Sequence, residues 1–584
     1  MQGVISPAGT ALSFAALALS LAACVEPWPR VAPNPLAAPG APGATAAAGA
    51  RRCLSVVGWN DLHGQLGPDD PVVDTGRVAA GGVVALADQL SAIRATGDTV
   101  VVLDAGDLFT GPLASTLAEG APVIEAYNLL GVDAAALGNH DFDFGPVGSD
   151  KVTAPAGVGD EAGAAGPRGA LLARMAEARF PFLSANVHRK GGAAPGWPGH
   201  RPSTLLVRGD FKVGVVGYTT KDTPTTTLRP NVADLDFATD AAASVAREIR
   251  ALRLAGAAPV VLVAHASIEG ELPGSLADAA PHTGEMARLA ADLGPDLPDL
   301  IVAGHRHAWL LGRVSGVPIV SSDQHGVGLA RARFCGAGAA GPVDRPVLEG
   351  IERRAALATT PPLTALGVAV AAAMAPWEAR IKAVADAPVA ILPAACEPRS
   401  PVGTALADQV ARAAAENLAA AATPPPGVPV VGLTNVGSLR APLAAGQARF
   451  RDMFTVLPFE NTVAACGTTR AGLTRFLENG LRKDASRERF PFGVAGAKLR
   501  VKRGPDGKLA LTGVEIEGLA ADAKDDAPVW LAISDFILWG GDDLLAGVTC
   551  APGAVSQTRL RDAWARVLTR EKACGGPSRN VVVE

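Results

Sequence analysis

Short apolar runs, each followed by a small cluster of Asp, Asn or His, recur along the first half of this chain. Five such runs begin at Leu54, Val100, Ala134, Val260 and Leu300. Apolar runs of this length between turn-forming residues are typical of buried strands in a parallel sheet. The alternation of these runs with helical stretches from about residue 52 to 345 predicts βαβ units and an α/β fold.

Other segments show the helical, strand and loop patterns that complete this picture. Residues 83–95 and 123–130 have apolar residues at helical spacing between strands, and 211–218 predict a further strand. Residues 365–385 predict a helix that links the two halves of the chain, and 404–422 carry a second helical pattern.

Two segments with strong turn-forming composition predict loops. Residues 146–170 are rich in Gly and Ala without a periodic pattern, and residues 423–429 contain three consecutive prolines. A second α/β domain is expected to follow the proline loop to the end of the chain.

The first 50 residues have the composition of an export signal and a tether. An apolar stretch over 8–23 is too short to span a bilayer comfortably and lies where the hydrophobic part of a signal peptide lies. It ends in Leu21-Ala-Ala-Cys24, which resembles the lipobox of bacterial lipoproteins, where the Cys is acylated. Residues 27–50, rich in Pro, Ala and Gly, indicate a tether. Because residues 1–10 contain no Lys or Arg, a cleaved secretory signal and a retained segment stay open.

These patterns predict five regions and a location. We expect a signal peptide over 1–23, a lipid-anchored tether over 24–52, a layered α/β domain over 53–350, a linker with a helix over 351–390, and a second α/β domain over 391–584. The expected location is the bacterial cell envelope, with the chain held to the membrane through Cys24.

Charge argues against one class of partner. The net charge of −5 and the pI near 6.0 do not suit a protein that binds nucleic-acid polymers, for which a basic face is expected. An anionic substrate would therefore need local help from metal ions or from a few arginines.

Six cysteines remain when Cys24 is set aside, and an even number in an exported protein favours disulfides. Cys53 opens the first strand and Cys335 closes the last strand of the same domain, so we expect these two to pair. The pairing of the other four stays open: Cys396, Cys466, Cys550 and Cys574.

The polar clusters after the strands predict a metal site. The ligand of an open α/β sheet lies at the carboxyl ends of its strands. Two divalent ions about 3.5–4 Å apart need a bridging carboxylate, and they activate water between them. Asp107 follows Gly106 and is the expected bridge. The full set of expected ligands is Asp61, His63, Asp107, Asn139, His265, His305 and His307. Each has an ordinary structural explanation alone, but together they favour two ions such as Mn, Zn or Co.

The ordered motifs resemble those of calcineurin-like metallophosphoesterases over roughly residues 53–335. The matching segments are Asp61-x-His63, Gly106-Asp107, Gly138-Asn-His-Asp141, His265 and Gly304-His-x-His307. The resemblance implies the layered α/β fold of that family and phosphoester hydrolysis.

The resemblance also implies a reactive pair beside the metal ligands. It assigns His140, with Asp143 holding its other ring nitrogen, to stabilising the transition state and protonating the leaving group. A solvent-facing turn residue is the alternative for Asp143. Asp104 could compete with Asp107 as a ligand. The remaining histidines match no motif and are treated as structural or surface residues: His188, His200, His282 and His325.

The second half resembles the C-terminal domain of bacterial periplasmic 5'-nucleotidase/UDP-sugar hydrolases and animal ecto-5'-nucleotidases. The matching segments are Gly403-Thr-Ala-Leu-Ala-Asp408, Asn435-Val-Gly-Ser-Leu-Arg440, Leu457-Pro-Phe459-Glu-Asn461 and Asp535-Phe536-Ile-Leu-Trp-Gly-Gly-Asp542. The resemblance implies a nucleotide substrate.

Each matching residue has a physical reason to bind part of a nucleotide. Phe459 and Phe536 could stack on a base, and Asn461 could hydrogen-bond its edge. Asp542 could accept from ribose hydroxyls, and Arg440 could grip phosphate through its fork of donors. Core packing remains the alternative for the two Phe residues.

The chain departs from the pattern of that family at several positions. Only Arg399 lies near Gly403, where further arginines are usual. Gly437-Ser438 replaces the usual Gly-Gly pair, and Asp543-Leu544 replaces the expected Gly-Tyr. The class of substrate is therefore predicted, but the particular nucleotide is not.

The sequence as a whole predicts a dinuclear-metal phosphohydrolase that releases phosphate from nucleotides at the cell envelope. One alternative is a thiosulfohydrolase of sulfur oxidation, which shares the fold and metals. Another is a surface lipoprotein that binds nucleotides without catalysis. That alternative predicts broken metal motifs, and none is broken.

Overall fold

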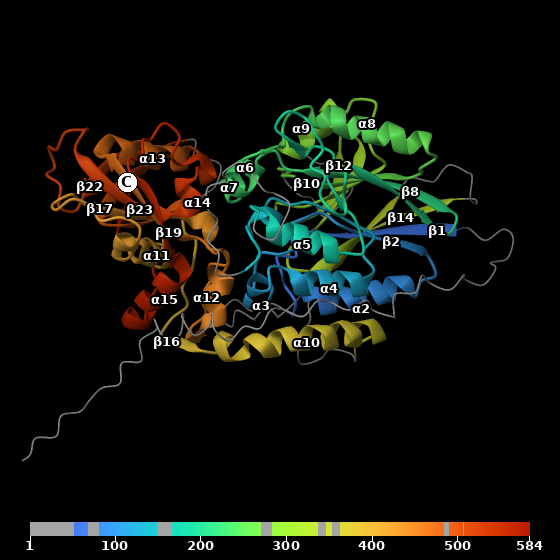
Figure 1. Cartoon of the computed structure of the whole chain (residues 1–584), viewed down its shortest axis with the longest axis horizontal. Coiled ribbons are helices and arrows are strands. Elements are labelled where there is room, and N and C mark those ends of the chain that lie inside the picture. The colour runs from blue at the N-terminus through green and yellow to red at the C-terminus, as the bar shows by residue number, and fades with distance from the viewer. Residues whose placement is uncertain are drawn as a thin grey trace, which may run out of the picture.

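The computed structural model describes residues 52–67, 81–148, 166–269, 283–336, 346–352, 363–483, 490–505 and 507–584. The expected signal peptide, Cys24, the tether and most of the predicted loop over 146–170 lie outside these residues. Figure 1 shows two lobes joined along one side by the long helix α10 (Ala365–Ala385).

The N-terminal lobe contains two sheets that pack face to face. The first has the order β15-β14-β1-β2-β3-β4-β6, and the second has the order β12-β13-β11-β10-β8-β7. The strands of the first sheet are β1 (Arg52–Trp59), β2 (Thr99–Asp104), β3 (Ala134–Ala136), β4 (Phe182–Leu183), β6 (His200–Arg201), β14 (Gly328–Gly336) and β15 (Val347–Glu352). Those of the second are β7 (Ser203–Arg208), β8 (Phe211–Thr219), β10 (Val260–His265), β11 (Leu300–Ala303), β12 (Ala308–Val314) and β13 (Val317–Asp323).

The five apolar runs are strands, as predicted, but they do not share one sheet. β1, β2 and β3 are parallel neighbours in the first sheet, whereas β10 and β11 are parallel neighbours in the second. Apolar side chains of both sheets form one core between them, and Val302 lies directly against Gly58. An apolar run covered on both faces has the same pattern whether a helix or a second sheet covers it, so the pattern does not reveal this division.

Helices cover the outer faces of the two sheets. α2 (Gly82–Arg94), α4 (Ala121–Leu130) and α5 (Gly169–Glu177) pack on the first sheet, and α8 (Ala241–Leu254) and α9 (Glu285–Asp292) on the second. The first two include the helical patterns seen at 83–95 and 123–130. Shorter elements of this lobe are α3 (Leu113–Leu117), α6 (Thr223–Thr226), α7 (Arg229–Val232), β5 (His188–Arg189), β9 (Leu235–Asp236) and the 3₁₀ turn η1 (His140–Phe142).

Helix α10 begins and ends where its pattern predicts and packs on α2 and α4. The Thr364 hydroxyl caps its first turn by accepting from Gly367 N at 3.1 Å, and it donates to Asp88 of α2 at 2.7 Å. Trp377 Nε1 donates to Glu125 of α4 at 2.8 Å. The linker helix is therefore part of the outer layer of the N-terminal lobe.

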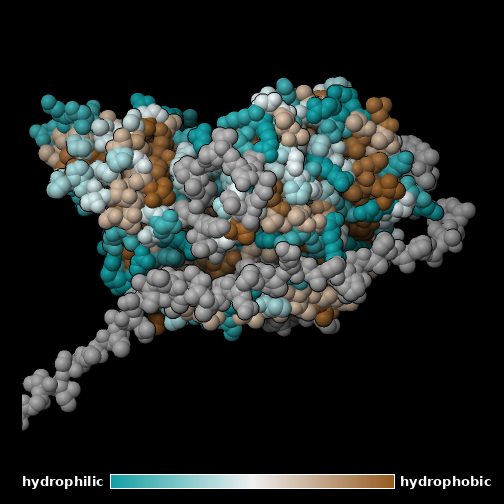
Figure 2. Space-filling view, in the orientation of Figure 1, coloured by the Kyte–Doolittle hydropathy of each residue, from teal (hydrophilic) through white to brown (hydrophobic). Residues whose placement is uncertain are grey.

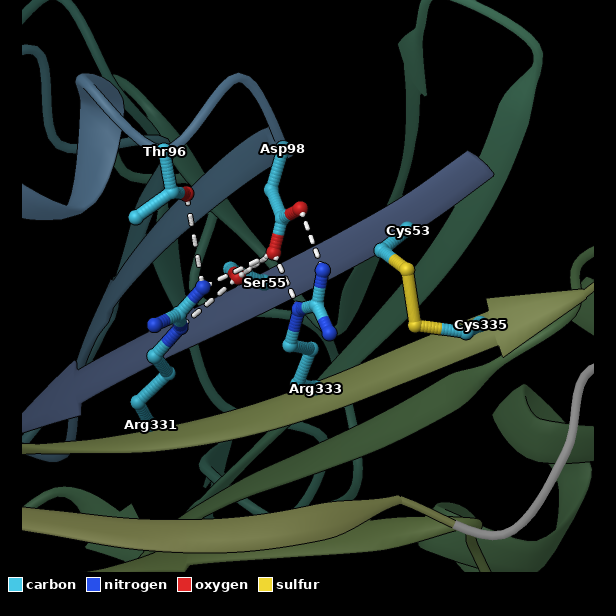
Figure 3. Close-up of a disulfide and its surroundings, with 7 residues drawn as sticks. All are labelled: Cys53, Ser55, Thr96, Asp98, Arg331, Arg333 and Cys335. Atoms are coloured by element: carbon cyan, nitrogen blue, oxygen red, sulfur yellow. Dashed lines mark hydrogen bonds and ion pairs between the residues drawn. A yellow bond between two sulfur atoms is a disulfide. The ribbon is translucent and has the colours of Figure 1, made fainter. Parts of the chain in front are cut away.

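A disulfide joins the first and the last long strands of the N-terminal lobe (Figure 3). Cys53 and Cys335 are opposite each other in the antiparallel pair of β1 and β14, and their sulfur atoms are bonded, which confirms the expected pairing. Beside it, the Asp98 carboxylate accepts hydrogen bonds from Arg333, Ser55 and Arg331. The hydrogen bond from Arg333 is the largest reason that the pKa of Asp98 falls to about 2.

The C-terminal lobe is a second α/β domain around a five-stranded sheet of order β20-β17-β23-β19-β24. Helices α11 (Ala405–Glu416) and α15 (Leu560–Glu571) cover one face, and α13 (Arg470–Lys483) covers the other. The strands are β17 (Val430–Asn435), β19 (Thr462–Thr469), β20 (Phe492–Ala495), β23 (Pro528–Ser534) and β24 (Gly553–Arg559).

Smaller elements complete this lobe. They are β16 (Pro388–Leu392), β18 (Gly446–Arg449), β21 (Ala497–Arg503), β22 (Leu509–Ile516), β25 (Val581–Val583), α12 (Phe450–Val456), α14 (Asp535–Leu538) and the 3₁₀ turns η2 (Leu418–Ala420), η3 (Val436–Ser438) and η4 (Gly541–Asp543). Two further disulfides, Cys396–Cys574 and Cys466–Cys550, lie within it.

Hydrophobic side chains on the side shown in Figure 2 lie in separate patches among hydrophilic ones. The most exposed large apolar residues, such as Leu254 and Ile391, come from different lobes. Within the described ranges, no helix has the length and apolar character needed to cross a membrane.

Candidate metal centre and domain interface

The residues predicted as metal ligands come together although they belong to two sheets. Two groups of side chains have ligand atoms that all lie within 4.8 Å of one another: Asp61, His63, Asp107 and His307 in one, and Asp107, His265 and His305 in the other. Asp107 belongs to both groups, which is the position expected of a bridging carboxylate.

Short distances define each group. His307 Nε2 lies 3.2 Å from Asp61 Oδ1 and 3.1 Å from His63 Nε2. In the second group, His265 Nε2 lies 3.1 Å from Asp107 Oδ2 and 3.1 Å from His305 Nδ1. The amide oxygen of Asn139 lies 3.1 Å from the same His265 Nε2, beside the second group.

Five of the seven expected ligands have a backbone in the left-handed region, which is uncommon for residues other than Gly and is adopted most often by Asn, Asp and His. Asp61, His63, Asp107, His305 and His307 have φ values of 49°, 48°, 60°, 81° and 53°. Such residues cost of order 1–3 kcal/mol each and persist where the surroundings hold them, often at functional sites. Here Asp61 N donates to Gly106 O and His63 N to Asp107 O, both at 2.9 Å.

Two glycines allow the strand ends to approach. A Cβ on Gly138 would lie 2.1 Å from Asp107 Oδ1, and one on Gly106, whose φ is 94°, would lie 2.7 Å from Gly138 N. Side chains at either position would push Asp107 away from its neighbours. The Gly in each of these two motifs is therefore required by close packing around Asp107.

Backbone carbonyls orient two of the imidazoles. His265 Nδ1 lies 2.8 Å from Ala105 O, and His63 Nδ1 lies 3.0 Å from Thr110 O. Nδ1–H donates to these carbonyl oxygens, which turns Nε2 of each ring toward the ligand groups, where its unprotonated form would bind a cation. The buried Asp141 carboxylate accepts from Leu108 N at 2.7 Å and Gly138 N at 2.8 Å, and it holds together the two turns that carry Asp107 and Asn139.

The electrostatics of the site suit a cation. Burial alone would raise the pKa values of Asp61 and Asp107, but the neighbouring histidines hold both well below their usual range. Burial alone would lower the pKa of His265, but Asp107 raises it to about 10, whereas burial and His265 lower the pKa of His305 to about 3. Ionised carboxylates, imidazoles and an amide oxygen are a donor set that divalent ions such as Zn and Mn accept.

The expected reactive pair is formed at the edge of this site. His140 Nδ1 lies 2.7 Å from Asp143 Oδ2, and the Thr227 hydroxyl donates to Asp143 Oδ1 at 2.8 Å. His140 N donates to Asp107 Oδ1 at 2.8 Å, which ties the pair to the shared carboxylate. Asp143 therefore has specific partners, unlike a turn residue that faces only solvent.

Two residues of the C-terminal lobe reach this pair across the domain boundary. Arg440 Nη2 lies 3.2 Å from His140 Nε2, and the rings of Phe459 and His140 have centroids 5.4 Å apart. The Arg440 guanidinium also lies over the Phe459 ring, at 5.5 Å from its centroid. In Figure 1, α6 and α7 of the N-terminal lobe face the C-terminal lobe near α14, and α6 contacts η4.

The other residues predicted to bind substrate have partners inside the C-terminal lobe. Phe536 packs on Gly541, where a Cβ would lie 2.4 Å from the ring. Asn435 Nδ2 donates to Asp542 Oδ2 at 2.8 Å. Asn461 Nδ2 donates to the buried Asp535 carboxylate at 2.9 Å, so this amide group supports its own domain. Both Phe rings are half-buried and pack on cores of this lobe.

One histidine assigned to a structural or surface role lies at the site instead. The His325 ring lies 6.0 Å from that of His63, and its backbone N donates to Asp61 O at 2.8 Å. Its φ of 56° matches those of the ligands. The signal was present in the sequence, because His325 and Gly326 follow the apolar strand β13.

Asp104, His188 and His200 belong to neither ligand group. Asp104, which could have competed with Asp107, accepts from Tyr127 OH at 2.6 Å and Gly106 N at 2.7 Å, and burial raises its pKa to about 7. His188 and His200 lie in β5 and β6, away from the two ligand groups, and His282 lies outside the described residues.

Comparisons with known proteins agree with this architecture. Residues 383–547 match the family model described as 5'-nucleotidase, C-terminal domain. Snake venom 5'-nucleotidase from Gloydius brevicauda is 34% identical over 174 residues, which are 29% of this chain and 26% of that protein. The chain thus spans about a quarter of the length of this relative. A probable 5'-nucleotidase from Treponema pallidum (strain Nichols) is 25% identical and aligns over 87% of this chain and 90% of its own length.

Solved structures share the fold over most of the chain. The 5'-nucleotidase precursor from Thermus thermophilus has a TM-score of 0.70 and 20% identity, covering 91% of this chain and 99% of its own. The sulfate thiohydrolase SoxB of Thermus thermophilus has a TM-score of 0.64 and 18% identity, covering 91% and 96%. The predicted two-domain α/β fold is confirmed, and residues 383–547 are similar to the 5'-nucleotidase C-terminal domain.

Proposed function

We propose that this chain is a metal-dependent phosphohydrolase that releases phosphate from nucleotides at the bacterial cell envelope. One observation carries the proposal. The Asp107 carboxylate is shared by two ligand groups, and Arg440 and Phe459 of a 5'-nucleotidase-type domain lie against the His140 that adjoins it. The full-length relative from Treponema pallidum supports the same class of activity.

The ligand groups would hold two divalent cations, with Asp107 between them. When bound, such cations supply an activated water and offset the charge of a phosphate. The protein itself contributes pre-oriented donors: Nε2 of His265 and His63 face the site because their Nδ1 atoms are held by backbone carbonyls.

His140 and Arg440 would act on the phosphate ester. Asp143 binds Nδ1 of His140, so Nε2 faces the Arg440 guanidinium at 3.2 Å. An ester oxygen that replaces this contact would meet donors from both lobes, once His140 is protonated at Nε2. His140 Nε2 is then placed to protonate the leaving oxygen, and Arg440 to bind a phosphate oxygen.

The C-terminal lobe would hold the nucleoside. The Phe459 ring lies beside His140, so a base stacked on it would place the attached phosphate near the ligand groups. Phe536 and Asp542 lie together at the Gly540-Gly541 turn and would complete the nucleoside site.

A phosphate-release screen of the purified protein tests this proposal. The protein is loaded in turn with manganese, zinc and cobalt and given nucleoside monophosphates, nucleoside diphosphates, simple phosphate esters and a thiosulfonate. We expect phosphate release that depends on the added metal and is faster from nucleotides than from simple esters. Release from neither class of phosphate ester would contradict the proposal.

A thiosulfohydrolase is the second candidate, because the sulfate thiohydrolase SoxB is nearly as similar in fold as the 5'-nucleotidase precursor. A substrate that ends in a thiosulfonate has no base to stack on Phe459. Hydrolysis of the thiosulfonate alone in the same screen would favour this candidate.

We also propose that the mature chain begins at an acylated Cys24, which follows the lipobox-like Leu21-Ala-Ala. Mass spectrometry of the N-terminal peptide and fractionation of a Cys24→Ser variant test this. A wild-type N-terminus at Met1, or at a residue other than 24, would contradict lipidation.

A further inference from the structure

Loop 457–461, which carries Phe459, is held by one buried cation. The Arg561 side chain of α15 is 1% exposed. Its Nη1 donates to Leu457 O at 3.2 Å and to Phe459 O at 3.1 Å, and its Nη2 bonds Glu460. The Arg561 guanidinium therefore binds the loop at three residues, Leu457, Phe459 and Glu460.

Further contacts leave the loop little freedom. Leu560 N donates to Asn461 O at 2.8 Å, and Arg440 N donates to Val456 O at 2.8 Å. Arg559 Nε pairs with Glu460 Oε2 at 2.5 Å. The start of α15 thus holds the loop from one side, and the segment that carries Arg440 holds its beginning.

A buried guanidinium is an expensive way to stabilise a fold. Removing a charge from water costs free energy that is recovered only if its donors are well bonded, and apolar side chains often replace such groups without loss of stability. The Arg561 guanidinium also lies over the Phe454 ring, 3.2 Å from its centroid, so an apolar side chain would have a packing partner there. The geometry of its hydrogen bonds points to a role in orienting the loop.

We propose that Arg561 is a positioning residue that sets substrate selection by holding Phe459 against His140. This inference rests on the proposed nucleotide phosphohydrolase. Arg561 touches no reacting group itself. It acts through the backbone of the loop, so its loss should affect substrates that use the Phe459 ring and spare those that do not.

The test compares three variants of the full mature enzyme, loaded with metal, on a nucleoside 5'-monophosphate and on an aryl phosphate. Arg561→Met removes the charge and the fork but keeps an unbranched apolar side chain beside Phe454. Arg561→Lys keeps the charge but is a single-point donor that does not reproduce the fork. Arg570→Met is the matched control, because Arg570 also lies on α15 and pairs with a carboxylate, Glu416, but is exposed.

For Arg561→Met we expect KM for the nucleotide to rise by about 5- to 150-fold, the range of one lost stacking contact. The kcat/KM for the aryl phosphate should stay within about 2-fold, because that substrate lacks the base. Arg561→Lys should recover part of the nucleotide KM, and Arg570→Met should match the wild type. Thermal unfolding of every variant shows whether a loss of activity is caused by a loss of stability instead.

Equal losses on both substrates, no loss on either, or losses that track the melting temperature would overturn the inference. If Arg561→Met does not fold, Glu460→Gln is measured in the same way, with the same expected split between substrates. A wild-type enzyme that hydrolyses no nucleotide would contradict the proposed function and this inference together. An active wild type with an unaffected Arg561→Met would contradict the inference alone.

Discussion

Arg440 of the C-terminal lobe lies 3.2 Å from His140 of the N-terminal lobe, although 300 positions separate them in the sequence. The contact joins the residue expected to grip phosphate to the residue expected to protonate the leaving group. The two domains therefore meet at the point where bond cleavage would occur. The shared ligand Asp107 and the aromatic ring of Phe459 both adjoin His140 at this contact.

Replacement of His140 separates its role from that of the ligands. His140→Ala should keep both metals, because the His140 side chain belongs to neither ligand group. It should lower kcat by roughly 10²–10⁴-fold, the usual effect of losing a positioned acid–base group. Metal analysis and steady-state kinetics check this, with His188→Ala in β5 as the control. Loss of metal from His140→Ala would show that its role is assigned wrongly.

Replacement of Asp107, which both ligand groups share, should lower the metal content as well as the activity. Asp107→Ala removes a ligand from both groups, and His265→Ala removes one from a single group. We expect about two divalent ions per wild-type chain, fewer in either variant, and no measurable turnover. Elemental analysis of the purified proteins gives the occupancies. Full activity of either variant in buffer with a chelator would rule out the dinuclear site.

Local patterns predicted much of the fold. The helical pattern over 365–385 coincides with α10, and the apolar runs coincide with β1, β2, β3, β10 and β11. The pairing of Cys53 with Cys335 followed from their places at the two ends of the domain and is confirmed. The expected metal ligands could also be picked out, because each lies at the end of a strand or a few residues beyond it and so at a sheet edge.

What the patterns could not predict depends on contacts between distant segments. Whether β10 lies beside β3 or in a second sheet is decided by packing that an apolar run does not encode. The hydrogen bond from Thr227 to Asp143 joins residues 84 positions apart. The hydrogen bond from Arg561 to Phe459 O joins residues 102 positions apart. His325 is different: its place after an apolar strand was visible, but it matched no family motif.

The carboxylate beside the first disulfide makes a prediction about stability and pH. Asp98 accepts from Arg331, Arg333 and Ser55, so Asp98→Asn should lower the free energy of unfolding near pH 6 by about 1–2 kcal/mol. The folded-state pKa of about 2 lies below the ordinary value of 3.8, so this stabilisation is present above about pH 4 and disappears as the pH falls toward 2.

Denaturant unfolding of wild type and Asp98→Asn at several pH values checks this. The difference between the two should be constant at neutral pH and shrink in acid. A difference that is independent of pH down to the lowest value at which the protein folds would mean that the charge of Asp98 contributes nothing.

We expect the N-terminal lobe to perform the chemistry while the C-terminal lobe selects a nucleotide. The most direct measurement is kcat/KM for a nucleoside 5'-monophosphate and for an aryl phosphate, in wild type and Phe459→Ala. Phe450→Ala is the control, since Phe450 is also half-buried in this domain but packs against Phe454. We expect Phe459→Ala to lose about 1–3 kcal/mol of transition-state stabilisation on the nucleotide and much less on the aryl phosphate. Equal losses on the two substrates would contradict it, because they would assign the ring to core packing and not to a nucleotide.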